Sequence, residues 1–389
     1  MRSLALLAAV ALAACGVDPT GRHEERDRKS ASAASAQPTA AAPAVDTLAA
    51  RDPASGTAPD PALADDQPRP VMQLQVVLDR LGFTPGVVDG KQGLSTRNAI
   101  RGFQESRGLP TTGELDAGTR QALAGWSNIP ATRVVTIPAD FAAGPFEATP
   151  EKPEDQAKLP ALGYQSLDEK LAERFHTTPA VLLALNSAKA APASTASASS
   201  KPLSEPATAS HFQAGQQLRV PNVGADAVDS ASVADARWRD TLIMLGVGSH
   251  QPKAEKVVVS KSQGTLRAYD AAGKLIGMYT ATMGSRHDPL PLGAWKVVGI
   301  ARNPDFAFNP ELFWDVPDSH AKQRLPPGPN GPVGIVWIDL DKPHYGIHGT
   351  PEPESIGRAQ SHGCVRLTNW DAARLAQMVK PGTAVVFES

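Results

Sequence analysis

Apolar residues recur with helical spacing in the first stretch of the chain that carries an aromatic side chain. An apolar stripe at i, i+3, i+4 and i+7 predicts an amphipathic helix that Gly82 ends. A second helix is predicted after Ser95 or Thr96, one of which would cap it, and a third begins after the cap Asp116. Residues 71–126 are therefore predicted to form a small all-α domain. The stripe residues are Leu74, Val77, Leu78 and Leu81 in the first helix and Ala99, Ile100 and Phe103 in the second.

The middle of the chain, residues 160–222, predicts a short α+β unit. Two helices are expected over 167–175 and 179–186, because apolar positions repeat there and Pro179 suits a helix start. Residues 188–210 are an Ala, Ser, Thr and Pro low-complexity insertion, after which the pattern predicts a turn into a strand that ends near Pro221.

From Lys256 onward the pattern changes to short strands separated by Gly, Pro or Asp turns. One helix is predicted over 369–379, with Thr368 or Asn369 as its cap, before a closing strand. Residues 256–389 are therefore predicted to be a mostly-β domain. The predicted strands are 257–259, 265–269, 275–282, 294–300 and 385–387.

The remaining segments predict export and tethering. Residues 1–15 combine a positive start, an apolar run and Cys15 after two alanines, which resembles the lipobox of bacterial lipoproteins and implies that Cys15 is lipidated. Residues 16–70 contain no aromatic residue and are predicted to be a disordered tether. Segments 127–159 and 223–255 are read as linkers. Gly16 is not the inner-membrane retaining Asp, so we expect a periplasmic protein held by lipid, at the outer membrane.

Composition narrows the function. The 389 residues carry 38 basic and 40 acidic side chains, and a formal net charge of −2 argues against a nucleic-acid binder. The chain has 2 cysteines, which excludes a disulfide-rich scaffold. If Cys15 is lipidated, Cys364 has no partner, and an unpaired thiol in an oxidising compartment requires an explanation.

Two segments near the C-terminus carry candidate chemistry. In the strand 345–350, alternation places Ile347 on the face opposite His348, and in an extended segment Cys364 and Arg366 share a face while Val365 and Leu367 point to the core. A guanidinium and an imidazole beside a thiol favour the thiolate, so a Cys–His pair predicts covalent catalysis on a carbonyl. Backbone N–H groups at Gly363 and Cys364 could then form an oxyanion hole. A zinc site built from His344, His348, His362 and Cys364 remains an alternative, as does an inert buried cysteine.

The segments HGT at 348–350 and SHGCVR at 361–366 resemble the signature of YkuD-type L,D-transpeptidases. The resemblance implies a β-sandwich catalytic domain over 256–389, with Cys364 as nucleophile and His348 as general base. It further implies that the Gly349 carbonyl orients the histidine. Ser361, His362 and Arg366 are expected to shape the acyl pocket. Gly331 stands where many members of the family have Asn, so the loop near the site is expected to differ from theirs.

Two further resemblances concern wall binding. Residues 71–126 resemble the three-helix peptidoglycan-binding domain through the motifs GFTPG at 82–86 and TGELD at 112–116. Residues 160–222 resemble a degenerate LysM module once the low-complexity insertion is removed, although the opening strand is weak.

Together these observations predict a multidomain, lipid-anchored peptidoglycan enzyme without a cofactor. Cys364 is expected to cleave the bond between the third residue and D-Ala of a tetrapeptide stem and to pass the acyl group to an amine. The acceptor, a second stem giving a 3→3 cross-link or a wall-linked protein, stays open. The alternatives are an L,D-carboxypeptidase and a non-catalytic peptidoglycan tether.

Overall fold

The protein is described from a computed structural model that covers most of the chain beyond the predicted tether. The described residues are 67–187, 208–224, 228–312, 321–358, 361 and 363–389. Cys15, His362 and most of the low-complexity insertion lie outside them. Within these ranges we find no helix with the length and apolar character needed to cross a bilayer.

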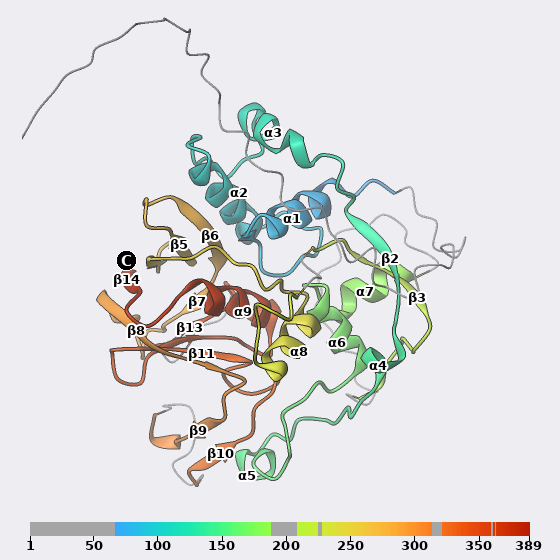
Figure 1. Ribbon diagram of the computed structural model, residues 1–389, viewed down its shortest axis with the longest axis vertical. Helices are drawn as coiled ribbons and strands as arrows, with labels where there is room; N and C mark the ends of the chain where they lie inside the picture. The colour runs from blue at the N-terminus through green and yellow to red at the C-terminus, as the bar shows by residue number, and fades with distance from the viewer. Residues whose placement is uncertain (1–66, 188–207, 225–227, 313–320, 359–360, 362) are drawn as a thin grey trace, which may run out of the picture. The chain divides into compact units, whose positions relative to one another are not determined.

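The first unit contains the three predicted helices (Figure 1). Helix α1 (Pro70–Arg80) ends before Gly82, whose φ of +83° suits glycine. Helix α2 (Leu94–Ser106) begins one residue before Ser95 and has no side-chain cap, so the expected Ser95 or Thr96 cap is wrong. Helix α3 (Ala117–Leu123) is capped as predicted, since the Asp116 side chain accepts from the Thr119 N–H at 2.7 Å. A 3₁₀ turn (Ala124–Trp126) follows.

A short strand joins this unit to the C-terminal sheet. Strand β1 (Phe83–Thr84) pairs in parallel with β6 (Leu275–Thr280). The two regions that the sequence separates into domains therefore share one hydrogen-bonded sheet.

The second unit is a pair of strands with helices between them. Strand β2 (Thr132–Thr136) pairs antiparallel with β3 (Gln217–Pro221), and helices α6 (Leu167–Arg174) and α7 (Pro179–Asn186) lie between them in the chain. Segment 127–159 also holds the short helices α4 (Ala139–Ala142) and α5 (Pro153–Gln156), so its expected role as a linker is wrong. The LysM-like pattern predicts a weak opening strand within residues 160–222. In the structure the strand that pairs with β3 is β2, which lies before that range. Residues 132–223 are called the βααβ unit below.

The expectation that residues 223–255 form a linker is also wrong, because this segment contains helix α8 (Ala236–Leu245). Asp235 caps the helix, and Gly246 ends it at a φ of +63°. Trp238, Leu242 and Leu245 are buried within the main hydrophobic cluster of the C-terminal domain. Helix α8 is therefore part of that domain's core.

We expect Leu242→Ala to lower the free energy of unfolding by about 2–5 kcal/mol, because it leaves a cavity where a fully buried side chain stood. Urea denaturation measures the effect. Ile243→Ala is the matched control: Ile243 is 46% exposed, and its truncation should cost less than about 1 kcal/mol. Equal effects of the two substitutions would show that α8 does not pack on the core.

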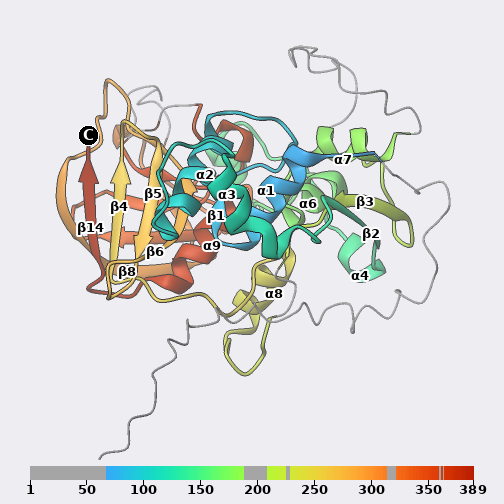
Figure 2. The same cartoon turned by 90° about the horizontal axis from the view of Figure 1, so that it is seen from above.

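The C-terminal domain is built on one continuous sheet, in the order β1-β6-β5-β4-β14-β8-β11-β12-β13-β7. Strand β8 (Gly293–Arg302) pairs with β14 (Ala384–Glu388) through its first residues and with β11 (Val336–Leu340) through its later ones, and so links the two halves. Figure 2 shows β14, β4, β5 and β6 side by side. The other strands are β4 (Lys256–Ser260), β5 (Thr265–Tyr269), β7 (Thr282–Met283), β12 (Gly346–His348) and β13 (Val365–Arg366), with β9 (Phe306–Phe308) and β10 (Gln323–Leu325) as a separate pair.

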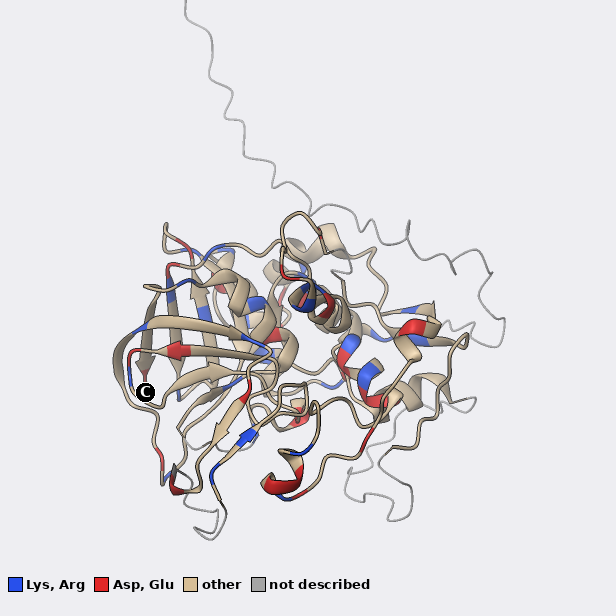
Figure 3. Ribbon diagram, turned by 60° about the horizontal axis from the view of Figure 1, so that its bottom comes forward, with Lys and Arg blue, Asp and Glu red and all other residues tan. Residues whose placement is uncertain are grey.

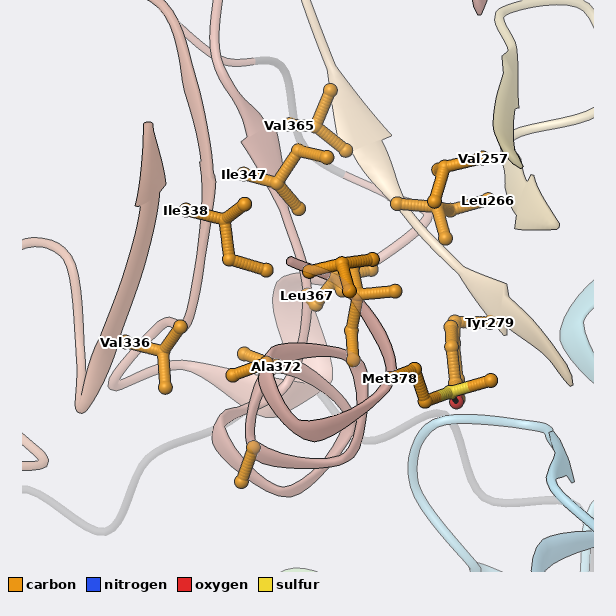
Figure 4. Close-up of a cluster of buried hydrophobic side chains, with 14 of the residues drawn as sticks. Val257, Leu266, Tyr279, Val336, Ile338, Ile347, Val365, Leu367, Ala372 and Met378 are labelled. Carbon is orange, nitrogen blue, oxygen red and sulfur yellow. Dashed lines mark hydrogen bonds between the residues drawn. The ribbon is translucent and has the colours of Figure 1, made fainter. Parts of the chain in front are cut away.

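The core of this domain lies between the sheet and helix α9 (Asn369–Met378). Figure 4 shows side chains from several strands pointing toward Leu367 and Ala372. The mostly-β fold class is therefore confirmed, as is Thr368 as the cap of α9. Two short 3₁₀ turns (Pro310–Leu312 and Pro353–Ser355) complete the domain. Basic and acidic residues are interspersed along the described elements, in keeping with the small net charge (Figure 3).

Candidate active site

Strand β12 holds His348 in the middle of a three-strand arrangement. His348 pairs with Trp337 of β11 on one side and with Arg366 of β13 on the other. The β12–β13 pair is parallel, so residues in register point to the same face. His348 and Arg366 therefore share one face of the sheet. Cys364 directly precedes β13, and the Gly346 N–H of β12 lies close enough to favour its thiolate.

The opposite face of these strands forms the core. Ile347 and Val365 pair with each other and are buried, and Leu367 is buried beside them (Figure 4). The alternation predicted for both segments is confirmed. One short parallel pair thus buries its apolar residues and places the His348 imidazole and the Arg366 guanidinium on its other face, with Cys364 directly before β13.

The His348 ring is buried and fixed by two contacts. Its Nδ1 lies 2.7 Å from the Gly349 carbonyl oxygen, which can only accept, so Nδ1 carries the proton and Nε2 keeps a lone pair. The ring stacks on Trp337, with centroids 5.5 Å apart. Burial, together with the nearby Arg366 cation, lowers the pKa of His348 to about 4. At neutral pH the imidazole is therefore uncharged.

Cys364 is half-buried and uncharged at neutral pH. Its Sγ donates weakly to the His344 carbonyl oxygen at 3.7 Å. Burial raises the pKa of the thiol, and this outweighs the Gly346 N–H and Arg366, both of which favour the thiolate. Arg366 favours the thiolate as expected, but desolvation is the larger effect, so the uncharged thiol is the resident form.

No hydrogen bond joins Cys364 to the His348 ring in the structure. Such bonds are often long in enzymes without bound substrate, so Cys364 and His348 remain a candidate acid–base pair. Because both the thiol and the imidazole are neutral, covalent chemistry by this pair would need a proton transfer during attack.

Ser361 braces the turn that presents the cysteine. Its hydroxyl donates to the Cys364 carbonyl oxygen at 2.6 Å and accepts from the Gly284 N–H at 2.7 Å. Ser361 is buried, so these bonds fix the turn from inside. Of the expected acyl-pocket residues, His362 lies outside the described residues.

Tyr345 is a site residue that the sequence did not reveal. At Gly363, where φ is +103°, a Cβ would lie 2.7 Å from the Tyr345 ring, so only glycine allows the ring to pack on the turn. Burial raises the pKa of Tyr345, and Cys364 adds to the shift. The Lys342 ammonium lies 4.9 Å from the Tyr345 ring centroid and 5.4 Å from that of Trp295.

Among the described residues, no group of three His, Cys, Asp or Glu side chains is placed to hold a metal ion. The thiol of Cys364 and the imidazole of His348 are groups of the kind that covalent catalysis on a carbonyl uses.

Comparison with known proteins defines the class. Residues 254–387 match the family model of the L,D-transpeptidase catalytic domain, YkuD, and residues 67–123 match that of a peptidoglycan-binding domain. The YkuD protein of Bacillus licheniformis, named as an L,D-transpeptidase, is 32% identical over 145 residues, 37% of this chain and 72% of that protein. YqjB of Bacillus subtilis, with the same kind of name, is 32% identical over 136 residues, 33% of this chain and 69% of that protein.

A solved structure, L,D-transpeptidase 3 from Mycobacterium tuberculosis, has 22% sequence identity and a TM-score of 0.29, over 34% of this chain and 60% of that one. The chain belongs to the YkuD family of L,D-transpeptidases. Both resemblances, to these enzymes and to the peptidoglycan-binding domain, are confirmed. The LysM resemblance and the lipid on Cys15 stay predictions.

Proposed function

We propose that this protein is a peptidoglycan L,D-transpeptidase in which Cys364 is the nucleophile. The observation that supports this most directly is the parallel pairing of β12 with β13, which puts His348 beside Arg366. Arg366 follows Cys364 by two residues and favours its thiolate. The Gly349 carbonyl, by accepting from Nδ1, leaves Nε2 as the basic atom of His348. The peptidoglycan-binding domain matched at residues 67–123 supports the choice of substrate.

In the first half of the reaction, His348 Nε2 removes the thiol proton as Sγ attacks the carbonyl carbon of the third stem residue. The carbon–nitrogen bond to D-Ala then breaks, and the D-Ala amine leaves with the proton from His348. The product is a thioester on Cys364. In the second half, an acceptor amine attacks the thioester, gives a proton to His348, and releases the thiol.

The surrounding groups fit the charge that develops. The N–H groups of Gly363 and Cys364 are proposed to bind the oxyanion, because the Ser361 hydroxyl already holds the Cys364 carbonyl and fixes the turn. Arg366, on the same face, stabilises negative charge at the thiol and the acyl group. Tyr345 and Lys342 line the approach to Cys364.

The acceptor decides the biological outcome. A side-chain amine of a second stem gives a 3→3 cross-link, a lysine of a wall-linked protein gives an anchored protein, and water gives carboxypeptidase activity. A lipid on Cys15 would hold the enzyme at the periplasmic membrane surface, within reach of all three.

The test is incubation of the full chain with purified disaccharide-tetrapeptide muropeptides, followed by mass spectrometry of protein and products. We expect a transient protein adduct equal in mass to the donor less D-Ala, located on the peptide that contains Cys364. Dimers with a 3→3 bond should accumulate, with tripeptides if water competes. Meropenem provides a second probe, since acylation of Cys364 leaves a stable adduct.

Peptide mapping matters because the chain has a second cysteine, Cys15. An adduct at Cys15 alone, or no adduct and no released D-Ala, would contradict the proposal and leave a peptidoglycan-binding tether. Tripeptides without dimers would support the nucleophile but establish the carboxypeptidase.

A further inference from the structure

The side chain of Asn369 fills the space that two glycines leave open beside the candidate base. Asn369 is fully buried at the first position of α9. A Cβ added at Gly349 would lie 2.1 Å from Asn369 Oδ1, and one added at Gly334 would lie 2.0 Å from it. Oδ1 also accepts from the Ile335 N–H at 3.3 Å. The amide oxygen is thus packed directly on the backbone that carries the Gly349 carbonyl.

The other end of the same amide is held by a different part of the chain. Asn369 Nδ2 donates to Glu173 Oε1 at 2.8 Å and to the Pro329 carbonyl oxygen at 3.2 Å. Glu173 lies on α6 of the βααβ unit, outside the residues matched to the catalytic family. The Tyr164 hydroxyl donates to the second Glu173 oxygen. The Asn369 amide therefore connects helix α6 to the end of strand β12, where His348 lies.

This polar link has no obvious role in packing. A buried amide and carboxylate cost free energy unless both are fully paired, and an apolar pair of similar size would avoid that cost. Here Asn369 uses its oxygen and both donor hydrogens, and Glu173 uses both oxygens. What the polar link provides is a fixed amide orientation, with Oδ1 held against Gly349.

We propose that Glu173 and Asn369 are positioning residues, which hold the Gly349 carbonyl against His348 Nδ1 and make the βααβ unit part of the catalytic centre. The proposal rests on the proposed function, since it assigns His348 as the base. It goes further in that a residue outside the catalytic domain sets the tautomer and orientation of that base. The family's catalytic segment alone would then be an incomplete enzyme.

Asn369→Asp is the sharpest test, because it keeps the shape and the Oδ1 acceptor but replaces the donor to Glu173 with an acceptor. We expect the maximal rate of acylation by meropenem to fall by about 10- to 100-fold with little change in the half-saturating concentration. The new carboxylate near His348 should also move the acid limb of the pH–rate profile upward, by about one unit.

A reciprocal double variant, Glu173→Gln with Asn369→Asp, restores the hydrogen bond between residues 173 and 369 with donor and acceptor exchanged, while the bond to the Pro329 carbonyl oxygen stays lost. We expect it to recover most of the acylation rate while the acid limb stays shifted. Asn186→Asp is the matched control. Asn186 also bridges through its amide, to the backbone of Arg219, but inside the βααβ unit alone, so it should leave the rate and pH profile of acylation unchanged.

If Asn369→Asp does not fold, Glu173→Ala removes the acceptor of the same hydrogen bond. This variant should also lower the maximal acylation rate. Wild-type acylation at Cys364 with an unchanged rate and pH profile in these variants would overturn the positioning role and leave the proposed function intact. Absence of a Cys364 adduct in the wild type would instead contradict the proposed function itself.

Discussion

Replacing Cys364 with Ala is expected to abolish acyl transfer to muropeptides, with a loss of at least about a thousandfold in turnover. The reason is that the variant has no atom at this position able to form the thioester. The stability of the fold should change by less than about 1 kcal/mol, because the side chain is half-buried and Ser361 holds the turn through the backbone. Mass analysis of products and urea denaturation measure the two effects.

Cys364→Ser is the matched variant, because it keeps a nucleophile of similar shape with a far less acidic proton. It should form little or no adduct with meropenem. Continued 3→3 cross-linking by Cys364→Ala would refute the assignment of the nucleophile. In the wild type, alkylation of Cys364 by iodoacetamide should rise steadily from pH 7 into the alkaline range, since the pKa of the thiol lies above its ordinary value.

The geometry of this site could be predicted in part because strand alternation is local. The alternation of Ile347 with His348 and of Val365 with Arg366 is enough to say which of these side chains share a face, and the sheet confirms it. The protonation states could not be predicted, since they depend on how deeply the sheet buries Cys364 and His348. Arg366 favours the thiolate as expected, but burial has the larger effect and raises the pKa of the thiol.

Tyr345 escaped prediction for a conformational reason. Strict alternation from His348 would direct Tyr345 to the opposite face, away from the thiol. His344, however, has a φ of +67°, so the chain turns before β12 begins and alternation does not extend back to Tyr345. A non-glycine residue with positive φ leaves no clear signal in the sequence.

In the fold, too, elements fixed by neighbouring residues could be predicted, whereas elements fixed by partners far away in the chain could not. Helices with a clear apolar stripe or a polar cap, such as α3 and α9, are predicted to within a residue or two. The strands β1 and β2 are missed, because each is short and its partner lies far away in the chain, as for Thr132 and Pro221. Helix α8 is missed because its apolar face packs on a core assembled from later segments.

A buried ionic cluster connects the regions that the sequence predicts as separate domains. Arg374 of α9 makes two hydrogen bonds to the Asp79 carboxylate of α1, at 2.8 and 3.0 Å, and reaches Asp371 at 3.3 Å. His176, next to α6, binds the same Asp79 carboxylate and stacks on Trp370. Side chains from the helical unit, the βααβ unit and the catalytic domain therefore meet out of contact with water.

Replacing Arg374 with Met is expected to lower the free energy of unfolding at pH 7 by about 3–5 kcal/mol, because Asp79 and Asp371 stay buried without their cation. Lys380→Met is the matched control. Its ion pair with Glu255 is exposed, at 66% and 47% of the two side chains, and should contribute less than about 1 kcal/mol. Urea denaturation of both variants provides the comparison.

The pH dependence of the free energy of unfolding, compared between wild type and Arg374→Met, tests why the variant is less stable. In the wild type, burial alone would raise the pKa of Asp79, but Arg374 and His176 hold it below the ordinary value, so its contribution to stability is present above about pH 4 and lost only below it. Without Arg374 burial dominates and the pKa of Asp79 rises, so the variant should gain stability as the pH falls from 7 toward 4. The gap between wild type and Arg374→Met should therefore narrow on acidification. A gap that stays constant over that range would mean that lost packing of the Arg374 stem, not an uncompensated carboxylate, causes the destabilisation.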